Sequence, residues 1–223
     1  MVAESRSTHS ISVVVPVYRG AVTLPGLVDE LRELTAPHRT PAGEWMRVAE
    51  VLLVFDHGPD HSDEVIRELA ATHDFVRPIW LSRNYGQHAA TLAGMASSGS
   101  DWIVTLDEDG QYDPADIGAF LDVALEQQVS LVYASPRNPA PHGFLRNLAS
   151  RTAKRVVDLL VGGHEAHRYH SFRLILGEVG RSVAAYAGSG VYLDVALGWV
   201  AGDAATAPAT LREEGRESGY NLH

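Results

Sequence analysis

The chain has 223 residues, enough for one domain with a full hydrophobic core. Its formal net charge of −10 argues against a nucleic-acid-binding protein, because such proteins carry a basic face. The absence of cysteine excludes disulfide scaffolds and thiolate metal sites. No apolar run reaches the ~18 residues that a membrane-spanning helix needs. Residues 1–10 are polar and are expected to form a flexible tail.

Strands and helices are expected to alternate along the first 136 residues. Aliphatic and β-branched runs predict five buried strands, at 11–17, 48–55, 76–81, 102–106 and 129–133. Helical spacing and capping residues predict helices between them, at 24–34, after an Asp60 or Ser62 cap, at 87–97 and after an Asp113 N-cap. This alternation predicts an α/β fold with a mostly parallel central sheet flanked by helices. Ligands of such sheets bind at the carboxyl ends of the strands.

Two carboxylates follow the fourth predicted strand. Asp107 and Asp109 are two residues apart, so their side chains point the same way if the backbone stays extended. Both could then bind one hard divalent cation, which would offset their repulsion and also bind substrate phosphates. The alternative is that they are exposed turn residues leading to the Asp113 cap.

Polar residues also follow the second and third strands. Asp56 comes directly after the second strand, where it could bind a base or ribose, or act as a solvated turn residue. Residues 83–88 follow the third strand. There Gly86 permits a close backbone approach, and the helix from Gln87 offers free N–H groups, although a plain connection explains the segment equally well.

A basic segment marks a change of character after residue 136. Between Arg137 and Arg155 there are four arginines, one lysine and no acidic residue. These side chains could bind phosphate, or lie on the solvated face of a helix over about 145–161. His164, His167 and His170 are interpreted as loop histidines, with a metal site as the alternative.

Taken in order, the motifs resemble those of family-two glycosyltransferases with the GT-A fold. Val15-Pro16-Val17-Tyr18 is similar to the family's VPVYNE, residues 54–62 to VDDGSPDNS, Arg83-Asn84-Tyr85-Gly86 to RNxG, Asp107–Gln111 to DxDxQ, Ser171–Leu174 to GDFRL, and Arg212–Tyr220 to RxxGxSxY. The resemblance is strongest to the branch with dolichyl-phosphate mannose synthases and bacterial polyprenyl-phosphate glycosyltransferases. Relatives of that branch continue into membrane helices beyond the point that matches His223, so both a trimmed chain and a variant without them stay open.

The resemblance implies which residues bind the donor, the metal and the acceptor. Nucleotide-sugar binding falls on Pro16, Val17, Tyr18, Asp56, Asn84, Gly86, Gln87, Asp107, Glu108, Asp109, Arg212 and Arg216. Metal binding, of Mg²⁺ or Mn²⁺, falls on Asp107, Asp109 and Gln111. Acceptor binding falls on Arg137, Arg151, Ser171 and Arg173, and the expected catalytic residues are Asp107, Asp109, Arg137 and Arg173. Residues 11–136 would form the nucleotide-sugar half of one catalytic domain, and residues 137–223 its acceptor half.

Three positions depart from the family's pattern. Arg19-Gly20 replaces the usual Asn-Glu, Phe55 replaces the first Asp of the second motif, and Ser171 replaces the Asp before Phe-Arg-Leu. The last change removes the carboxylate that could serve as a general base at that position.

The expected activity is inverting, metal-dependent transfer of a sugar from a nucleotide-sugar donor to a polyprenyl phosphate. Alternatives are a hydroxyl-bearing glycan or metabolite as acceptor, a non-catalytic nucleotide-sugar-binding module, and a nucleotidyltransferase, for which the loop at 18–21 is too short and has too few glycines. The expected location is cytoplasmic, at the inner face of the membrane. No nucleic acid is expected as a partner, and a homo-oligomer stays open.

Overall fold

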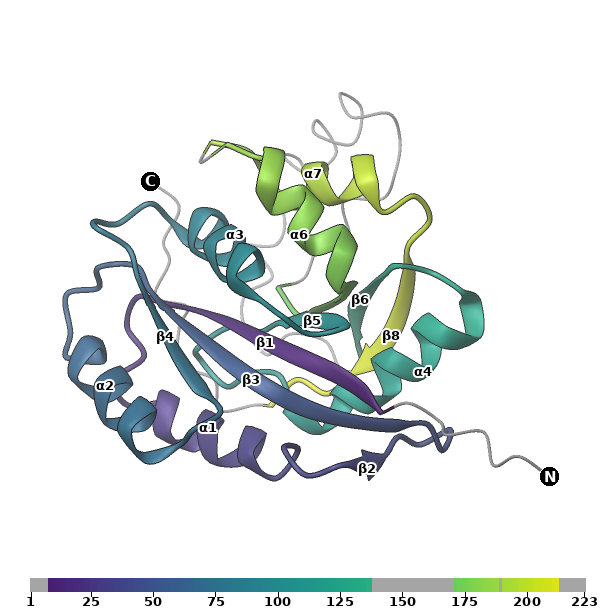
Figure 1. The fold of residues 1–223 in the computed structure, drawn as a ribbon, viewed down its shortest axis with the longest axis horizontal. Helices are drawn as coiled ribbons and strands as arrows, with labels where there is room; N and C mark the ends of the chain where they lie inside the picture. Colours follow the sequence, from purple (N-terminus) through teal and green to yellow (C-terminus); the bar gives the residue numbers. More distant parts are fainter. Residues whose placement is uncertain (1–7, 138–170, 189, 213–223) are drawn as a thin grey trace.

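The structure is a computed structural model that describes residues 8–137, 171–188 and 190–212. Within them an eight-stranded sheet forms the centre of the fold. Its strands are β1 His9–Val17, β2 His38–Arg39, β3 Trp45–Phe55, β4 Val76–Trp80, β5 Trp102–Thr105, β6 Leu131–Pro136, β7 Arg173–Leu176 and β8 Ala205–Ala209. Their order is β2-β3-β1-β5-β7-β6-β8, and β4 also pairs with β3 (Figure 1).

Most neighbouring strands are parallel. β1 pairs in parallel with β3 and β5, β3 with β4, and β6 with β8. The antiparallel strands are β2, which pairs with β3, and β7, which pairs with both β5 and β6. The expected α/β fold with a mostly parallel sheet is confirmed.

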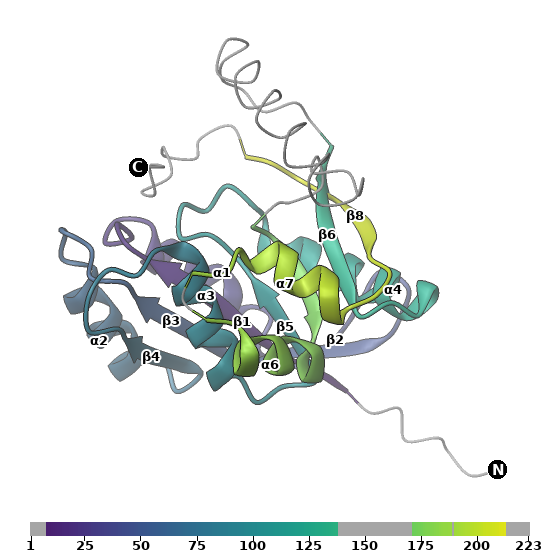
Figure 2. The same cartoon turned by 90° about the horizontal axis from the view of Figure 1, so that it is seen from above.

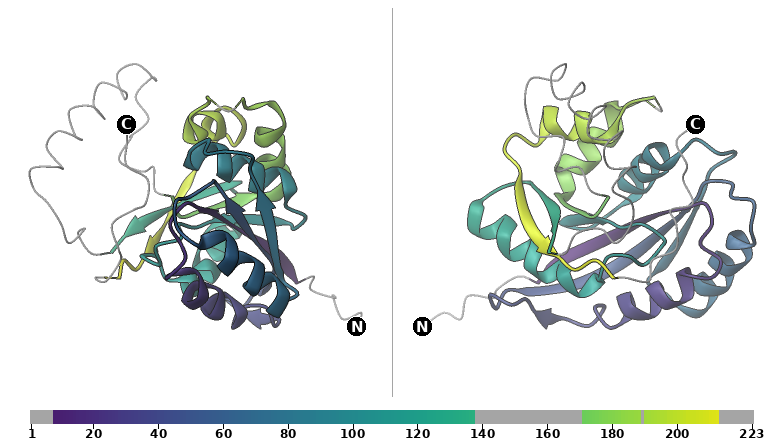
Figure 3. Two further views of the ribbon diagram at one scale, coloured as in Figure 1. Left: turned by 90° about the vertical axis from the view of Figure 1, so that its left-hand side faces the viewer. Right: turned by 180° about the vertical axis from the view of Figure 1, so that it is seen from behind.

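Helices cover both faces of the sheet (Figure 2 and Figure 3). One face carries α1 Leu24–Arg32, α2 Ser62–Thr72 and α4 Ile117–Gln127, which follows the short 3₁₀ helix η1 Pro114–Asp116. The other face carries α3 Gln87–Ser97, α6 Gly177–Tyr186 and α7 Leu193–Val200. No helix in the described part of the chain is long and apolar enough to cross a membrane.

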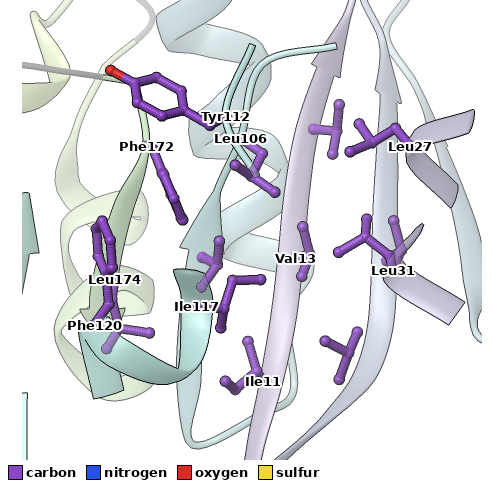
Figure 4. Close-up of a cluster of buried hydrophobic side chains, with 14 of the residues drawn as sticks. Ile11, Val13, Leu27, Leu31, Leu106, Tyr112, Ile117, Phe120, Phe172 and Leu174 are labelled. Carbon is purple, nitrogen blue, oxygen red and sulfur yellow. The ribbon is translucent and has the colours of Figure 1, made fainter. Parts of the chain in front are cut away.

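Two apolar clusters, one on each face, are separated by the sheet. Along β1 the side chains alternate: Val13 and Val15 belong to the cluster under α1 and α4, and Val14 to the cluster under α3. Figure 4 shows the first cluster, in which Leu27 and Leu31 of α1 lie with the β1 side chains. Each fully buried aliphatic side chain stabilises the fold by roughly 1.5–3 kcal/mol. This explains why β1 has apolar residues on both faces.

The structure differs locally from the sequence-based expectation. Strand β2 is not among the five predicted strands. The predicted Asp113 cap is confirmed, since its side chain accepts a hydrogen bond from Ala115 N at 2.9 Å. The helix after it begins as the 3₁₀ turn η1. The expected boundary near residue 136 does not divide the molecule in space, because β7 lies within the sheet between β5 and β6. The expected helix at 145–161 and the three histidines lie outside the described residues.

Candidate active site at the carboxyl edge of the sheet

The loops that follow β1, β3, β4 and β5 meet at one edge of the sheet, because these strands are mutually parallel. β7 runs the other way, so its first residues lie at the same edge. The sequence motifs of both halves of the chain therefore come together, and hydrogen bonds link them directly.

Asp107, just after β5, is the meeting point of three segments. Gln87 Nε2, at the start of α3, donates to Asp107 Oδ1 at 2.5 Å, and Ser171 Oγ donates to Oδ2. Burial raises the pKa of Asp107, and the Ser171 hydroxyl, the Arg173 guanidinium and Gln87 act against that rise. The side chain is thus held in one orientation by a donor on each carboxylate oxygen.

Asp109 lies beside it in the turn before Tyr112. Gln111 N donates to Asp109 Oδ1 at 3.0 Å, and Gly110 has a φ of 67°, which lets the chain turn back sharply. Burial, and then repulsion from Asp107, raise the pKa of Asp109 to about 6. Two carboxylates that disfavour each other's charge in a poorly solvated place are suited to a divalent cation.

The donor set fits such a cation only in part. Carboxylate and amide oxygens from Asp107, Asp109 and Gln111 are the hard ligands that Mg²⁺ and Mn²⁺ prefer. No cluster of three or more His, Cys, Asp or Glu side chains suited to a metal occurs within the described residues. A cation here would therefore complete its coordination with substrate oxygens or water.

Glu108 points to a different neighbour, the loop after β1. Its carboxylate accepts hydrogen bonds from Tyr18 N at 2.8 Å and Arg19 N at 2.9 Å, and the residue is 5% exposed. Burial raises the pKa of Glu108 to about 7 against these two hydrogen bonds. Glu108 connects the loops that follow β1 and β5.

Asp56 is fully buried, which the turn interpretation does not predict. Its Oδ1 accepts from Tyr85 N at 2.7 Å, and its Oδ2 accepts from Gly86 N at 2.9 Å. These two hydrogen bonds fix the loop between β4 and α3 to the buried carboxylate. Its expected contact with a nucleotide base stays a prediction.

Arg173, expected as an acceptor ligand, lies in the interior. Its Nε donates to Asp194 Oδ1 at 2.8 Å and its Nη2 to Oδ2 at 3.1 Å, and the side chains are 7% and 2% exposed. Nη1 donates to Thr105 Oγ1 and to the Ser171 carbonyl, each at 3.3 Å. Its guanidinium is bonded to these partners in the structure, and its expected contact with the acceptor stays a prediction.

Sequence reasoning missed Asp194, the partner of this arginine. Tyr133 Oη also donates to it, at 3.3 Å, which completes a buried polar cluster. The one signal in the sequence is a single acid in the apolar segment Leu193–Val200, and an acid in a helix's first turn is equally explained by the helix dipole.

The model of glycosyl transferase family 2 matches residues 12–183, most of the chain. The chain belongs to this family. It is 35% identical over 155 residues to an undecaprenyl-phosphate 4-deoxy-4-formamido-L-arabinose transferase of Aeromonas hydrophila, covering 69% of this chain and 45% of the relative. The transferase of the same name in Pseudomonas fluorescens is 35% identical over 158 residues, with 69% and 43% covered. The chain thus spans less than half the length of these curated relatives.

Solved structures confirm the GT-A fold of this family member. A glucosyl-3-phosphoglycerate synthase from Mycobacterium tuberculosis, in complex with Mn²⁺, UDP-glucose and phosphoglyceric acid, superposes with a TM-score of 0.62 at 18% identity and covers 94% of this chain and 72% of its own. A mannosyltransferase from Pyrobaculum calidifontis, in complex with GDP-mannose and Mn²⁺, gives a TM-score of 0.63 at 15% identity, with 92% and 57% covered.

The remaining family-2 motif residues differ in how they are presented. Pro16 and Val17 are buried in β1, so their side chains do not face the edge, whereas Tyr18 is half-buried and Asn84 exposed. Val17 O already accepts from Asp56 N at 2.8 Å.

Two of the arginines expected to bind donor or acceptor flank the edge. Arg137 is exposed directly after β6. Arg212 N donates to Gln111 O at 2.9 Å, while its guanidinium pairs with Glu30 at 2.8 Å and with Asp113 at 3.2 Å. The predicted ligands Arg151 and Arg216 lie outside the described residues.

Proposed function

We propose that this chain is an inverting, metal-dependent glycosyltransferase that moves a sugar from a nucleotide-sugar donor to a polyprenyl phosphate. The observation that carries the proposal is the oriented pair Asp107 and Asp109 at the carboxyl edge of a GT-A sheet, in a member of glycosyl transferase family 2. The names of the curated relatives support the lipid-phosphate acceptor, and the complexes of the structural neighbours support the donor class.

Asp107, Asp109 and Gln111 would hold Mg²⁺ or Mn²⁺. When bound, the cation supplies positive charge against the diphosphate of the donor. The protein's own contribution is orientation: Gln87 and Ser171 fix the carboxylate of Asp107, and the turn at Gly110 fixes Asp109. Tyr18, Asn84 and Gly86, in the loops on either side, would contact the nucleoside.

The acceptor proposal rests on Arg137 and Ser171. Arg137 is exposed at the end of β6, whose carboxyl end lies at the site edge, and an arginine there is placed to bind phosphate bidentately. A phosphate is already ionised at neutral pH, so its attack on the anomeric carbon needs no protein base, whereas a hydroxyl does. Ser171, which donates to Asp107 where the family motif has a carboxylate, fits the phosphate better than the hydroxyl.

The two halves of the chain would divide this work, with residues 11–136 binding the nucleotide-sugar and residues 137–223 the acceptor. A polyprenyl phosphate would place the protein against a lipid surface, and we propose the inner face of the membrane. A homo-oligomer stays open.

The first experiment tests the donor site. Isothermal titration with nucleoside diphosphates is run with Mn²⁺ and with chelator, on wild type and on Asp109→Asn. Asp203→Asn is the matched control, because this exposed residue lies before β8, at the opposite edge of the sheet. We expect Mn²⁺ to raise affinity at least about tenfold in wild type and in the control, and not in Asp109→Asn. Equal affinity with metal and with chelator would refute the metal site.

The second experiment tests the reaction and its acceptor. The full chain should release nucleoside diphosphate slowly from a suitable donor without acceptor, and faster with a short polyprenyl phosphate. Arg137→Glu should lower transfer strongly and leave donor binding unchanged, while Arg47→Glu, exposed near the opposite edge, should change neither. Binding without any turnover would identify a non-catalytic module. Transfer to a neutral hydroxyl acceptor alone would refute the phosphate acceptor and leave the donor site standing.

A further inference from the structure

The loop after β1 is held by side chains from other loops. Glu108, which follows β5, accepts from the two consecutive backbone amides of Tyr18 and Arg19, with one carboxylate oxygen for each. An ionised carboxylate makes stronger hydrogen bonds to N–H groups than a neutral acceptor does. Glu108 is therefore the main link between this loop and the segment that carries Asp107 and Asp109.

The next two backbone amides of the same loop also donate hydrogen bonds to side chains. Gly20 N donates to Ser62 Oγ at 2.9 Å, and Ala21 N donates to Asp60 Oδ2 at 3.1 Å. Asp60 Oδ1 in turn accepts from Ser62 Oγ at 2.6 Å. Four consecutive N–H groups are thus bonded to side chains, so the conformation of the loop depends on those side chains.

Gly20 shows why the carboxylate can come from Glu108. A Cβ at Gly20 would lie 2.8 Å from Glu108 Oε2 and 2.8 Å from Leu24 Cγ, so the space that a side chain would enter is filled. The backbone of Gly20 does not have a positive φ, so it would otherwise accept any residue. Glycine is therefore required at position 20 because there is no room for a Cβ, and not because of the backbone conformation.

The Glu108 carboxylate fills the space beside position 20. There the family's opening motif VPVYNE has a glutamate and this chain has glycine, and a Cβ at Gly20 would lie 2.8 Å from Glu108 Oε2. We propose that Glu108 is a positioning residue that holds residues 18–21, from the β5 side, in the conformation that binds the donor nucleotide. The nucleotide part of this inference rests on the proposed function.

The test removes the carboxylate or crowds it. Glu108→Ala should lower the affinity for nucleoside diphosphate, measured with saturating Mn²⁺, by about tenfold or more, because two charge-assisted hydrogen bonds are lost. Gly20→Ala should also lower it, because its Cβ would enter the space that Glu108 Oε2 and Leu24 Cγ fill. Glu33→Ala, an exposed acid at the end of α1, is the control.

A second readout does not need the nucleotide. Amide hydrogen exchange at Tyr18 and Arg19 in the free protein should accelerate in Glu108→Ala, because both amides lose their acceptor. Glu108→Gln, which keeps one acceptor oxygen, should be intermediate in both measurements. With donor, KM should rise more than kcat falls, as expected for loop positioning and not for general loss of structure.

The outcomes separate this inference from the proposed function. Wild-type affinity and wild-type exchange in Glu108→Ala overturn the positioning role. A wild type that binds no nucleoside diphosphate overturns the proposed function, and the exchange measurements then still decide whether Glu108 holds the loop. Circular dichroism tests whether each variant is folded. If Glu108→Ala is unfolded, Glu108→Gln is compared with wild type in its place.

Discussion

Asp194→Asn is the substitution whose effect follows most directly from the structure. Asp194 and Arg173 form a bidentate ion pair whose side chains are 2% and 7% exposed. In the asparagine variant an NH₂ group replaces one of the two acceptor oxygens and faces a donor of Arg173, which keeps its charge. Breaking a buried ion pair from one side costs about 3–5 kcal/mol, because the remaining charge has lost its compensation.

That free energy predicts a measurable change in thermal stability. For a domain of this size, 1 kcal/mol corresponds to about 2–4 °C in Tm, so Asp194→Asn should lower Tm by roughly 6–20 °C. The assay is calorimetry or circular dichroism, with Asp203→Asn as the exposed control, for which no measurable change is expected.

A double variant separates lost charge compensation from lost packing. Arg173→Met with Asp194→Leu replaces the pair by apolar side chains, and such replacements of buried pairs are often neutral. The double variant should recover most of the lost stability, although the hydrogen bond from the Tyr133 hydroxyl to Asp194 is lost. If the stability of Asp194→Asn lies within about 1 kcal/mol of wild type, the Arg173 charge is not left uncompensated in the interior, and the reasoning is refuted.

Three further predictions concern other parts of the molecule. Asp56→Ala should weaken nucleoside diphosphate binding and speed amide exchange in the loop after β4, and unchanged exchange would contradict the role of Asp56 in holding that loop. Burial alone would raise the pKa of Glu50, but hydrogen bonds from a hydroxyl, a backbone amide and Arg77 lower it below the ordinary 4.5. Glu50 therefore stabilises the fold above that pH, and the stability difference between wild type and Glu50→Gln in chemical denaturation should shrink as the pH falls through the lowered pKa; a difference independent of pH would refute this. Gly94→Ala, whose Cβ would lie 2.3 Å from Val14 Cγ1, should cost about 1–3 kcal/mol in the same assay, and a neutral result would show that α3 moves easily on the sheet.

The sequence was sufficient for the parallel core of the fold because its signals there are local. β1 reads as a strand from Ile11 and the valines that dominate residues 11–17, and α3 was predicted with its observed bounds Gln87–Ser97. The place of β7 was not predictable in the same way. Its four residues pair with strands that are about 40 and 70 residues earlier in the chain, and no local pattern encodes such a pairing or its antiparallel direction.

In the candidate site too, locally encoded features were predicted and features that depend on distant partners were not. Asp107 and Gln87 were both expected at the edge from their positions after β5 and at the start of α3, and the structure joins them by a hydrogen bond. The burial of Arg173 and of Asp56 was not foreseen. Whether a charged side chain faces solvent or the interior depends on partners far away in the chain, and for Arg173 that partner is Asp194, 21 residues later.

The carboxylates at the edge have distinct structural tasks, and this affects how substitutions there must be interpreted. Asp56 holds the loop after β4, Glu108 holds the loop after β1, and Asp107 is itself held by Gln87 and Ser171. A loss of binding in any one variant therefore combines a lost ligand contact with a displaced loop. Because these loops share partners, the free-energy losses of paired substitutions will not add. Amide exchange in the free protein, measured beside nucleotide affinity, distinguishes a displaced loop from a lost ligand contact more directly than affinity alone.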